Sequence, residues 1–182
     1  GHDFRPAYRQ LQAAIEKLPT HPTVLALTAT ATPPVRQDIG EQLAIPAANF
    51  VITSFTRDNL AFKVVHPQVP DRQYIVQYLQ AHAGEAGIIY ANTRKKVESL
   101  AEYLQGQGFD VAAYHAGMAP EDRAAVQDAF LADQLPLIVA TNAFGMGIDK
   151  SNVRFVLHAT SAENLESYYQ EAGRAGRDGL PS

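Results

Sequence analysis

The chain has 182 residues, 46% of them hydrophobic, with a formal net charge of −4, six histidines and no cysteine. This length suits one domain, or one domain plus part of another, with enough apolar residues for a core. Having no cysteine excludes a disulfide scaffold and thiolate metal sites, and the negative charge argues against binding nucleic acid through bulk electrostatics.

The first residues, GHDFRPAYRQ, are polar and show no signal peptide. Apolar runs such as Gly87–Ala91 are only four or five residues long, too short to span a membrane. A helical pattern is under way by Ala7 although the first residue is Gly1. We therefore expect a fragment or a processed product of a longer protein.

Short apolar runs, which predict strands, alternate with segments of helical spacing. The runs are Val24–Leu27, Asn49–Ile52, Ala61–Val65, Gly87–Tyr90, Val111–Ala113, Leu137–Ala140 and Arg154–His158. Helices are predicted after Pro33-Pro34, over Tyr74–Leu79, from Thr93 to near Gly106, and over Ala125–Phe130 with Pro120 in the first turn. This alternation predicts an α/β fold, a mostly parallel sheet with helices on both faces and binding loops at the carboxyl ends of its strands.

A domain boundary is expected between Thr53 and Asn59. The single strand and two helical stretches before it cannot bury a core unaided, whereas the five or six strands and four helices after it can. We interpret residues 1–56 as the end of one α/β domain and residues 57–182 as a second, nearly complete one.

The segment QEAGRAGRDG, residues 170–179, has the features of a phosphate-contacting turn. Helical spacing from Glu163 onward places Gln170 and Arg174 one turn apart on one face, and Arg177 follows after two glycines. The arginine side chain is permanently charged and donates two parallel hydrogen bonds to phosphate oxygens. Glycine lets a partner surface approach the backbone closely. The alternative is a solvated helix end whose positive charge suits the helix C-terminus.

The segment ATNAFGMGIDK, residues 140–150, follows an apolar run, so Thr141 and Asn142 stand at the carboxyl end of a strand. Gly145 and Gly147 permit a turn whose N–H groups cup an anion. Asp149 is suited to accept from a ribose hydroxyl or to brace an arginine. An ordinary strand-to-turn segment is the alternative.

Arg94, Lys95 and Lys96 stand in the first turn of a predicted helix, where the macrodipole disfavours cations by about 0.3–1 kcal/mol each. An arriving anion would explain them, because N–H groups and cations then converge on it. The alternative is three solvated surface cations. Thr28 and Thr30 either relay hydrogen bonds between ligands or cap the helix that follows.

The turn Tyr114-His115-Ala116-Gly117 is suited to hold a phosphate of a nucleic-acid strand. For His115 itself we favour a packed or capping side chain over a catalytic one. The histidines show no metal-ligand spacing with one another or with carboxylates, so we predict no metal site.

In chain order, TATAT, IIYANTRKKVESL, YHAG, ATNAFGMGIDK and QEAGRAGRDG resemble the second half of a superfamily-two helicase motor. GHDFRPAY, LTATATP, SFTRDNL and FGMGIDKSNVRFVLH make the chain similar to the RecQ family of DNA helicases over essentially its whole length. The resemblance implies two RecA-like domains that sandwich ATP with Mg²⁺, move 3′ to 5′ along single-stranded DNA and part the duplex in repair and recombination. The alternatives are an RNA helicase of the same superfamily and a non-catalytic nucleic-acid-binding or protein-binding RecA-like module.

Residue roles follow from the resemblance by position. Arg177 matches the family's arginine finger, with Arg174 beside it and Gln170 in support. Gly147 and Asp149 match the segment that touches nucleotide and DNA, and Thr28 and Thr30 match the segment that couples hydrolysis to unwinding. The positions that match DNA-facing parts, or the element that begins the second domain, are Asn92, Thr93, Arg94, His115, Gly117, Thr141, Asn142, Ser54 and Arg57.

The chain departs from the complete family pattern, since it contains no GxxxxGK[ST] loop and no DExH box. ATP and Mg²⁺ are therefore expected to be bound mainly by residues upstream of Gly1, and Zn²⁺ only by a module downstream of Ser182. Thr56 and Asp58 stand where the family usually has Asp and Pro.

These departures set what we expect of the chain itself. Alone it is expected to hydrolyse no ATP, to unwind nothing and to bind single-stranded DNA weakly. The expected partners are single-stranded and duplex DNA and no membrane, for a monomer inside the cell, in the cytoplasm (nucleoid) or the nucleus.

Overall fold

The computed structural model describes residues 10–20, 22–28, 31–52, 56–145 and 148–182. The chain divides into two compact units, Gly1–Thr56 and Arg57–Ser182. Among the described residues, no helix has the length and apolar character needed to cross a membrane. The interpretation of the first unit as the end of a preceding RecA-like domain stays a prediction.

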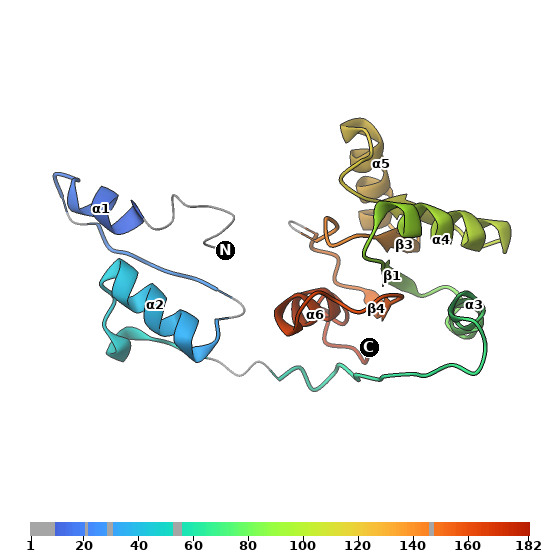
Figure 1. Ribbon diagram of the computed structural model, residues 1–182, viewed down its shortest axis with the longest axis horizontal. Helices are drawn as coiled ribbons and strands as arrows, with labels where there is room; N and C mark the ends of the chain where they lie inside the picture. The colour runs from blue at the N-terminus through green and yellow to red at the C-terminus, as the bar shows by residue number, and fades with distance from the viewer. Residues whose placement is uncertain (1–9, 21, 29–30, 53–55, 146–147) are drawn as a thin grey trace. The chain divides into compact units, whose positions relative to one another are not determined.

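The first unit contains α1 (Leu11–Glu16), α2 (Pro33–Leu43) and the short 3₁₀ helix η2 (Ala47–Asn49), joined by extended segments (Figure 1). The prolines lie in the first turn of α2, as predicted. The runs at Val24–Leu27 and Asn49–Ile52 are not strands, and Leu25, Leu27 and Val51 are 78%, 84% and 91% exposed. A strand needs a hydrogen-bonded neighbour, and the described part of this unit contains none, so those two strand predictions are wrong.

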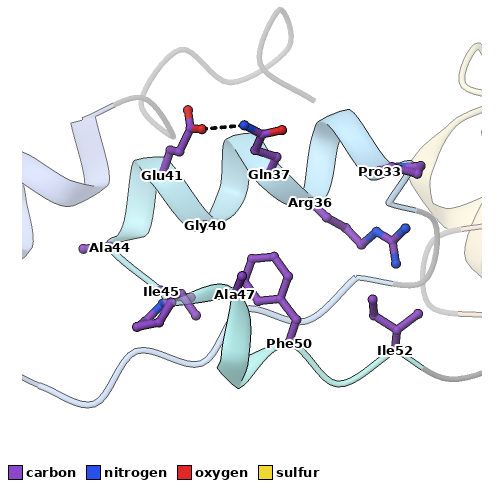
Figure 2. A pocket seen from close by; sticks show the side chains of 11 residues that line it. Pro33, Arg36, Gln37, Gly40, Glu41, Ala44, Ile45, Ala47, Phe50 and Ile52 are labelled. Carbon is purple, nitrogen blue, oxygen red and sulfur yellow. Dashed lines mark hydrogen bonds between the residues drawn. The ribbon is translucent and has the colours of Figure 1, made fainter.

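An open groove lies between α2 and the segment that follows it (Figure 2). The ring of Phe50 faces the middle of α2, where a Cβ on Gly40 would come within 2.6 Å of the ring atom Cζ. Glycine at this position therefore lets the ring approach the helix backbone. On the same helix Gln37 donates to Glu41 at 2.9 Å. The groove contains none of the predicted site residues.

The second unit is built on a parallel four-stranded sheet with the order β2-β3-β1-β4. The strands are β1 (Ala86–Tyr90), β2 (Val111–Tyr114), β3 (Leu137–Ala140) and β4 (Val153–His158). Tyr90 pairs with Ala140 and His158, and Tyr114 pairs with Ala140. All four strands therefore end at one edge of the sheet, where open α/β folds place their binding loops.

Helices cover both faces of this sheet. Ile88 and Ile89 are neighbours in β1, so their side chains point to opposite faces of the sheet. Both are fully buried, which shows that both faces are covered. Ile89 packs with α3 (Asp71–Ala81) and α4 (Arg94–Gly106), and Ile88 packs with Phe130 of α5 (Pro120–Leu131) and with the loop after β3. The predicted α/β class, with a mostly parallel sheet and helices on both faces, is confirmed.

The predicted helices of this unit are also confirmed. The side chain of Thr93 caps α4 by accepting from the Lys96 N–H at 3.2 Å, and Pro120 is in the first turn of α5. The strand predicted over Ala61–Val65 is wrong. The segment is extended but lies outside the sheet, because its backbone partner is the last residue of the chain: the Ala61 N–H donates to the Ser182 carbonyl at 2.9 Å.

Candidate functional site

The segment QEAGRAGRDG begins on α6 (Leu165–Ala172) and continues as a tight turn. Gly173 caps the helix, and the next residues form turns, with the Ala175 N–H donating to the Ala172 carbonyl at 3.1 Å. Gly176 has φ 59°, in the left-handed region that glycine enters without steric cost. Because α6 ends at Ala172, the prediction that Gln170 and Arg174 share one helix face is wrong. We call residues 173–177 the arginine turn.

Both arginines of this turn contact the loop after β3. The Nη1 of Arg174 donates to the Gly145 carbonyl at 2.7 Å. The Nη1 of Arg177 donates to the Ile148 carbonyl at 3.2 Å and to the Asp149 carboxylate at 2.9 Å. The structure thus brings together Arg174, Arg177 and Asp149, which the sequence predicted as one nucleotide-contacting set.

The two arginines differ in exposure. The side chain of Arg177 is 35% exposed and that of Asp149 is 89% exposed, so water and ligands reach this ion pair. Arg174 is half-buried, and its Nε is buried with no hydrogen-bond partner among the described residues. Glycine at position 145 leaves room for the Arg174 guanidinium, since a Cβ there would lie 2.3 Å from the Arg174 Nη2.

Arg57 joins the arginine turn from the beginning of the second unit. Its Nη2 donates to the carbonyls of Ala175 at 3.2 Å and Gly176 at 2.6 Å. Asn59 also donates to the Gly176 carbonyl, at 2.8 Å. Sequence reasoning missed this link, because the partners are more than a hundred residues apart and no local pattern marks carbonyl acceptors. The nucleic-acid contact expected of Arg57 stays a prediction.

A cationic surface lies at the start of α4, where Arg94, Lys95 and Lys96 are all exposed. Within the described parts of the chain, none of the three forms an ion pair. Arg94 lies against Gly117, where a Cβ would come within 2.8 Å of the arginine Nη1. The structure therefore joins two segments predicted to face DNA, one from the end of β1 and one from the end of β2.

His115 is packed beneath this surface and is 5% exposed. Its Nδ1 accepts from the Gly117 N–H at 3.2 Å, so its Nε2 carries the proton and faces the Glu98 carboxylate at 3.0 Å. This agrees with the packed or capping side chain favoured from the sequence. The DNA contact that the family resemblance implies for His115 stays a prediction.

Two more of the predicted residues of the edge line a small pocket at the ends of β1, β3 and β4. They are Asn92 and Asn142, and Thr160, two residues after the end of β4, lines it as well. Thr160 accepts from the Asn92 N–H at 2.9 Å and so ties two strand ends together. Thr141 is half-buried, and its hydroxyl accepts from the Ala143 N–H at 3.4 Å. Sequence reasoning missed Thr160, although its place after an apolar run was a usable signal.

Two buried polar side chains behind the site, Glu171 and Lys150, and the half-buried His158 were also missed. His158 pairs with Glu171 at 2.8 Å, which links β4 to α6. Lys150, 5% exposed, pairs with Asp133 and lies 5.2 Å from the centre of the Phe130 ring. The Lys150 pair anchors the end of the loop that carries Asp149. Sequence reasoning missed all three because each partner comes from a distant element.

Some predicted residues are not placed. Thr30, Ser54, Gly147 and the segment GHDFRPAY lie outside the described residues, and Thr28 is exposed in an extended part of the first unit. Where the chain is described, no group of three or more His, Cys, Asp or Glu side chains is arranged to hold a metal ion.

Comparison with known proteins gives one family match and many relatives. Residues 71–179 match the helicase conserved C-terminal domain. The ATP-dependent DNA helicase RecQ of Bacillus subtilis is 52% identical over all 182 residues, and that of Pasteurella multocida is 47% identical over the same span. The RecQ-like DNA helicase BLM of Xenopus laevis is 44% identical. The chain covers only 31%, 28% and 14% of these three relatives.

A solved structure shows the same fold. The structure of S. cerevisiae Dbp5 bound to RNA and ADP BeF3 aligns with 95% of this chain and 46% of its own, with a TM-score of 0.75. Sequence identity is 20%, so the likeness establishes the fold and nothing about the ligand.

Proposed function

The chain belongs to the RecQ family of DNA helicases and carries their helicase conserved C-terminal domain, and we propose that it forms part of a 3′ to 5′ ATP-dependent DNA helicase motor. In this proposal the second unit is the second RecA-like domain, and residues 1–56 end the first. The whole protein moves along single-stranded DNA and separates the duplex. It works inside the cell, where its DNA substrate is.

The observation that carries the proposal is the contact of both arginines with one loop. Arg174 contacts Gly145, and Arg177 already binds the exposed carboxylate of Asp149. A carboxylate and a phosphate offer a guanidinium the same kind of paired anionic oxygens. A phosphate that takes the place of Asp149 therefore finds a donor of suitable geometry in Arg177.

ATP with Mg²⁺ is the cofactor that the ATP-dependent relatives imply. The chain's own residues fit the nucleotide in two places. Arg177 and Arg174 supply positive charge for the phosphates, and Asp149, once released, can accept from a ribose hydroxyl. The bound cofactor supplies the phosphoryl group, and the arginines stabilise the charge that develops on its oxygens during transfer.

DNA binds, in this proposal, at the carboxyl edge of the sheet. Arg94, Lys95 and Lys96 neutralise phosphates, and Asn92 and Asn142 add hydrogen bonds at the neighbouring strand ends. Such contacts position the backbone and do not read the sequence of bases. This suits a motor that must move along any sequence.

The decisive experiment is Arg177→Ala in the full-length protein that carries this chain. DNA-stimulated ATP hydrolysis should fall by about 10³–10⁵ in kcat, the range found for arginine fingers. Single-stranded DNA binding should be unchanged. Arg72→Ala is a matched control because Arg72 also makes a side-chain hydrogen bond, to Ser99, but this bond joins α3 to α4 and does not involve the arginine turn. Full ATPase activity in the Arg177 variant would refute the proposal.

A second test uses the 182-residue chain alone. With neither a GxxxxGK[ST] loop nor a DExH box in its sequence, it should hydrolyse no ATP. A DNA-stimulated ATPase from this chain, lost again in Arg177→Ala, would contradict that expectation.

A further inference from the structure

Tyr90 is a buried polar residue that the proposed function leaves without a role. It ends β1 and is 3% exposed. Its hydroxyl donates to the carbonyl of Phe144 at 2.8 Å. Phe144 is itself 1% exposed, so this carbonyl lies where water does not replace a lost partner.

The Phe144 carbonyl belongs to the loop that holds the arginines. The next carbonyl along the chain, that of Gly145, accepts from Arg174 at 2.7 Å. Fixing one peptide group restricts the orientation of the next, because only two torsions separate them. The Tyr90 hydroxyl thus restricts the direction in which the Gly145 carbonyl points.

The charge of Arg174 also affects the Tyr90 phenol. Burial raises the pKa of the phenol to about 12, while the charge and hydrogen bonding of Arg174 act in the opposite direction. At neutral pH the phenol is therefore protonated and remains a donor. Its ring stacks on His158 with the centroids 5.6 Å apart, and His158 pairs with Glu171 of α6. Tyr90 is therefore in contact with the loop and with His158, the residue that ties β4 to α6.

We propose that Tyr90 is a positioning residue whose hydroxyl holds the Phe144 carbonyl beside Gly145, so that Arg174 is held in place to meet a phosphate. Without the hydroxyl, the Gly145 carbonyl and Arg174 vary in position. Arg174 is then placed correctly in fewer molecules at the moment of transfer. This inference rests on the proposed role of the arginines.

The test is Tyr90→Phe in the full-length protein, which keeps the ring and removes one hydrogen bond. We expect kcat for DNA-stimulated ATP hydrolysis, per folded molecule, to fall about 3–10-fold, the scale of one hydrogen bond. KM for ATP and Kd for single-stranded DNA should stay within about twofold, the scatter expected of effects that leave a contact intact. Tyr78→Phe is the matched control, since the Tyr78 ring also packs against the core, on Phe155, but it lies on α3 and not at the loop.

Two further variants separate positioning from a purely structural role. Gly145→Ala should lower kcat in the same way, because its Cβ would displace the Arg174 guanidinium while the Tyr90 hydroxyl remains. In an Arg174→Lys background, Tyr90→Phe should cause little further loss if the two residues act through one network. Independent, multiplying losses would overturn the inference, as would an unchanged kcat in Tyr90→Phe.

The outcomes also distinguish this inference from the proposed function. If Arg177→Ala lowers kcat but Tyr90→Phe does not, only the positioning role of Tyr90 is lost. If Arg177→Ala leaves kcat unchanged, the proposed function fails and the inference fails with it.

Discussion

Arg94 is the residue whose removal should change DNA affinity and stability in opposite directions. It is the first residue of α4, where the macrodipole disfavours a cation. It forms no ion pair within the described residues, so Arg94→Ala breaks no salt bridge. The free energy of unfolding of the second unit should therefore rise by roughly 0.3–1 kcal/mol.

The effect on DNA binding follows from phosphate neutralisation. On single-stranded DNA each phosphate contact contributes about −0.7 to the slope of log affinity against log salt concentration. If Arg94, Lys95 and Lys96 each neutralise one phosphate, the slope is about −2.1, and affinity falls roughly 20-fold between about 50 and 200 mM salt. Arg94→Ala should reduce the slope to about −1.4.

Fluorescence anisotropy of a labelled oligonucleotide at several salt concentrations measures this slope, and thermal unfolding of the same samples measures stability. Lys63→Ala is the matched control because Lys63 is an exposed cation in the extended segment outside the sheet. An unchanged slope would refute the reasoning. So would a loss of affinity that comes with a loss of stability, since damage to the fold would then explain both.

Three further changes test the structure. Gly87→Ala should lower the free energy of unfolding by about 1–3 kcal/mol in denaturant titration, because its Cβ would lie 2.1 Å from the buried Phe155 ring. Thr93→Ala should cost about 1 kcal/mol by removing the cap of α4, and Thr93→Ser should restore most of it. A hydrogen bond from Lys150 lowers the pKa of Asp133 below its usual 3.8. The stabilisation that ionised Asp133 contributes is therefore present above about pH 4 and lost as pH falls through its folded-state pKa. When the free energy of unfolding is measured across acid pH, Asp133→Asn should lack this loss.

Local patterns were enough to predict much of the second unit. Helix α4 was predicted with its first and last residues nearly right, because its apolar spacing, its Thr93 cap and Gly106 all lie within one short segment. The strands of the sheet were predicted because continuous apolar runs mark strands buried on both faces. The order of the motifs was enough to indicate the family.

The failed strand predictions have a different cause. Val24–Leu27 and Ala61–Val65 have strand-like composition, but a strand exists only where a neighbour offers hydrogen bonds. Ala61 finds its backbone partner in Ser182, at the other end of the unit. No local pattern contains that information.

The sequence by itself determined the α/β class and the family, and it predicted residue types suited to contact phosphate, because periodicity and side-chain chemistry are properties of short segments. Only the tertiary structure decided what holds those residues in place. Arg174 and Arg177 each donate to a backbone carbonyl 29 residues away in the sequence. The Tyr90 hydroxyl donates to the carbonyl of Phe144, which is 54 residues away. These contacts depend on how parallel strands bring distant loops together, and a carbonyl acceptor leaves no mark in the sequence.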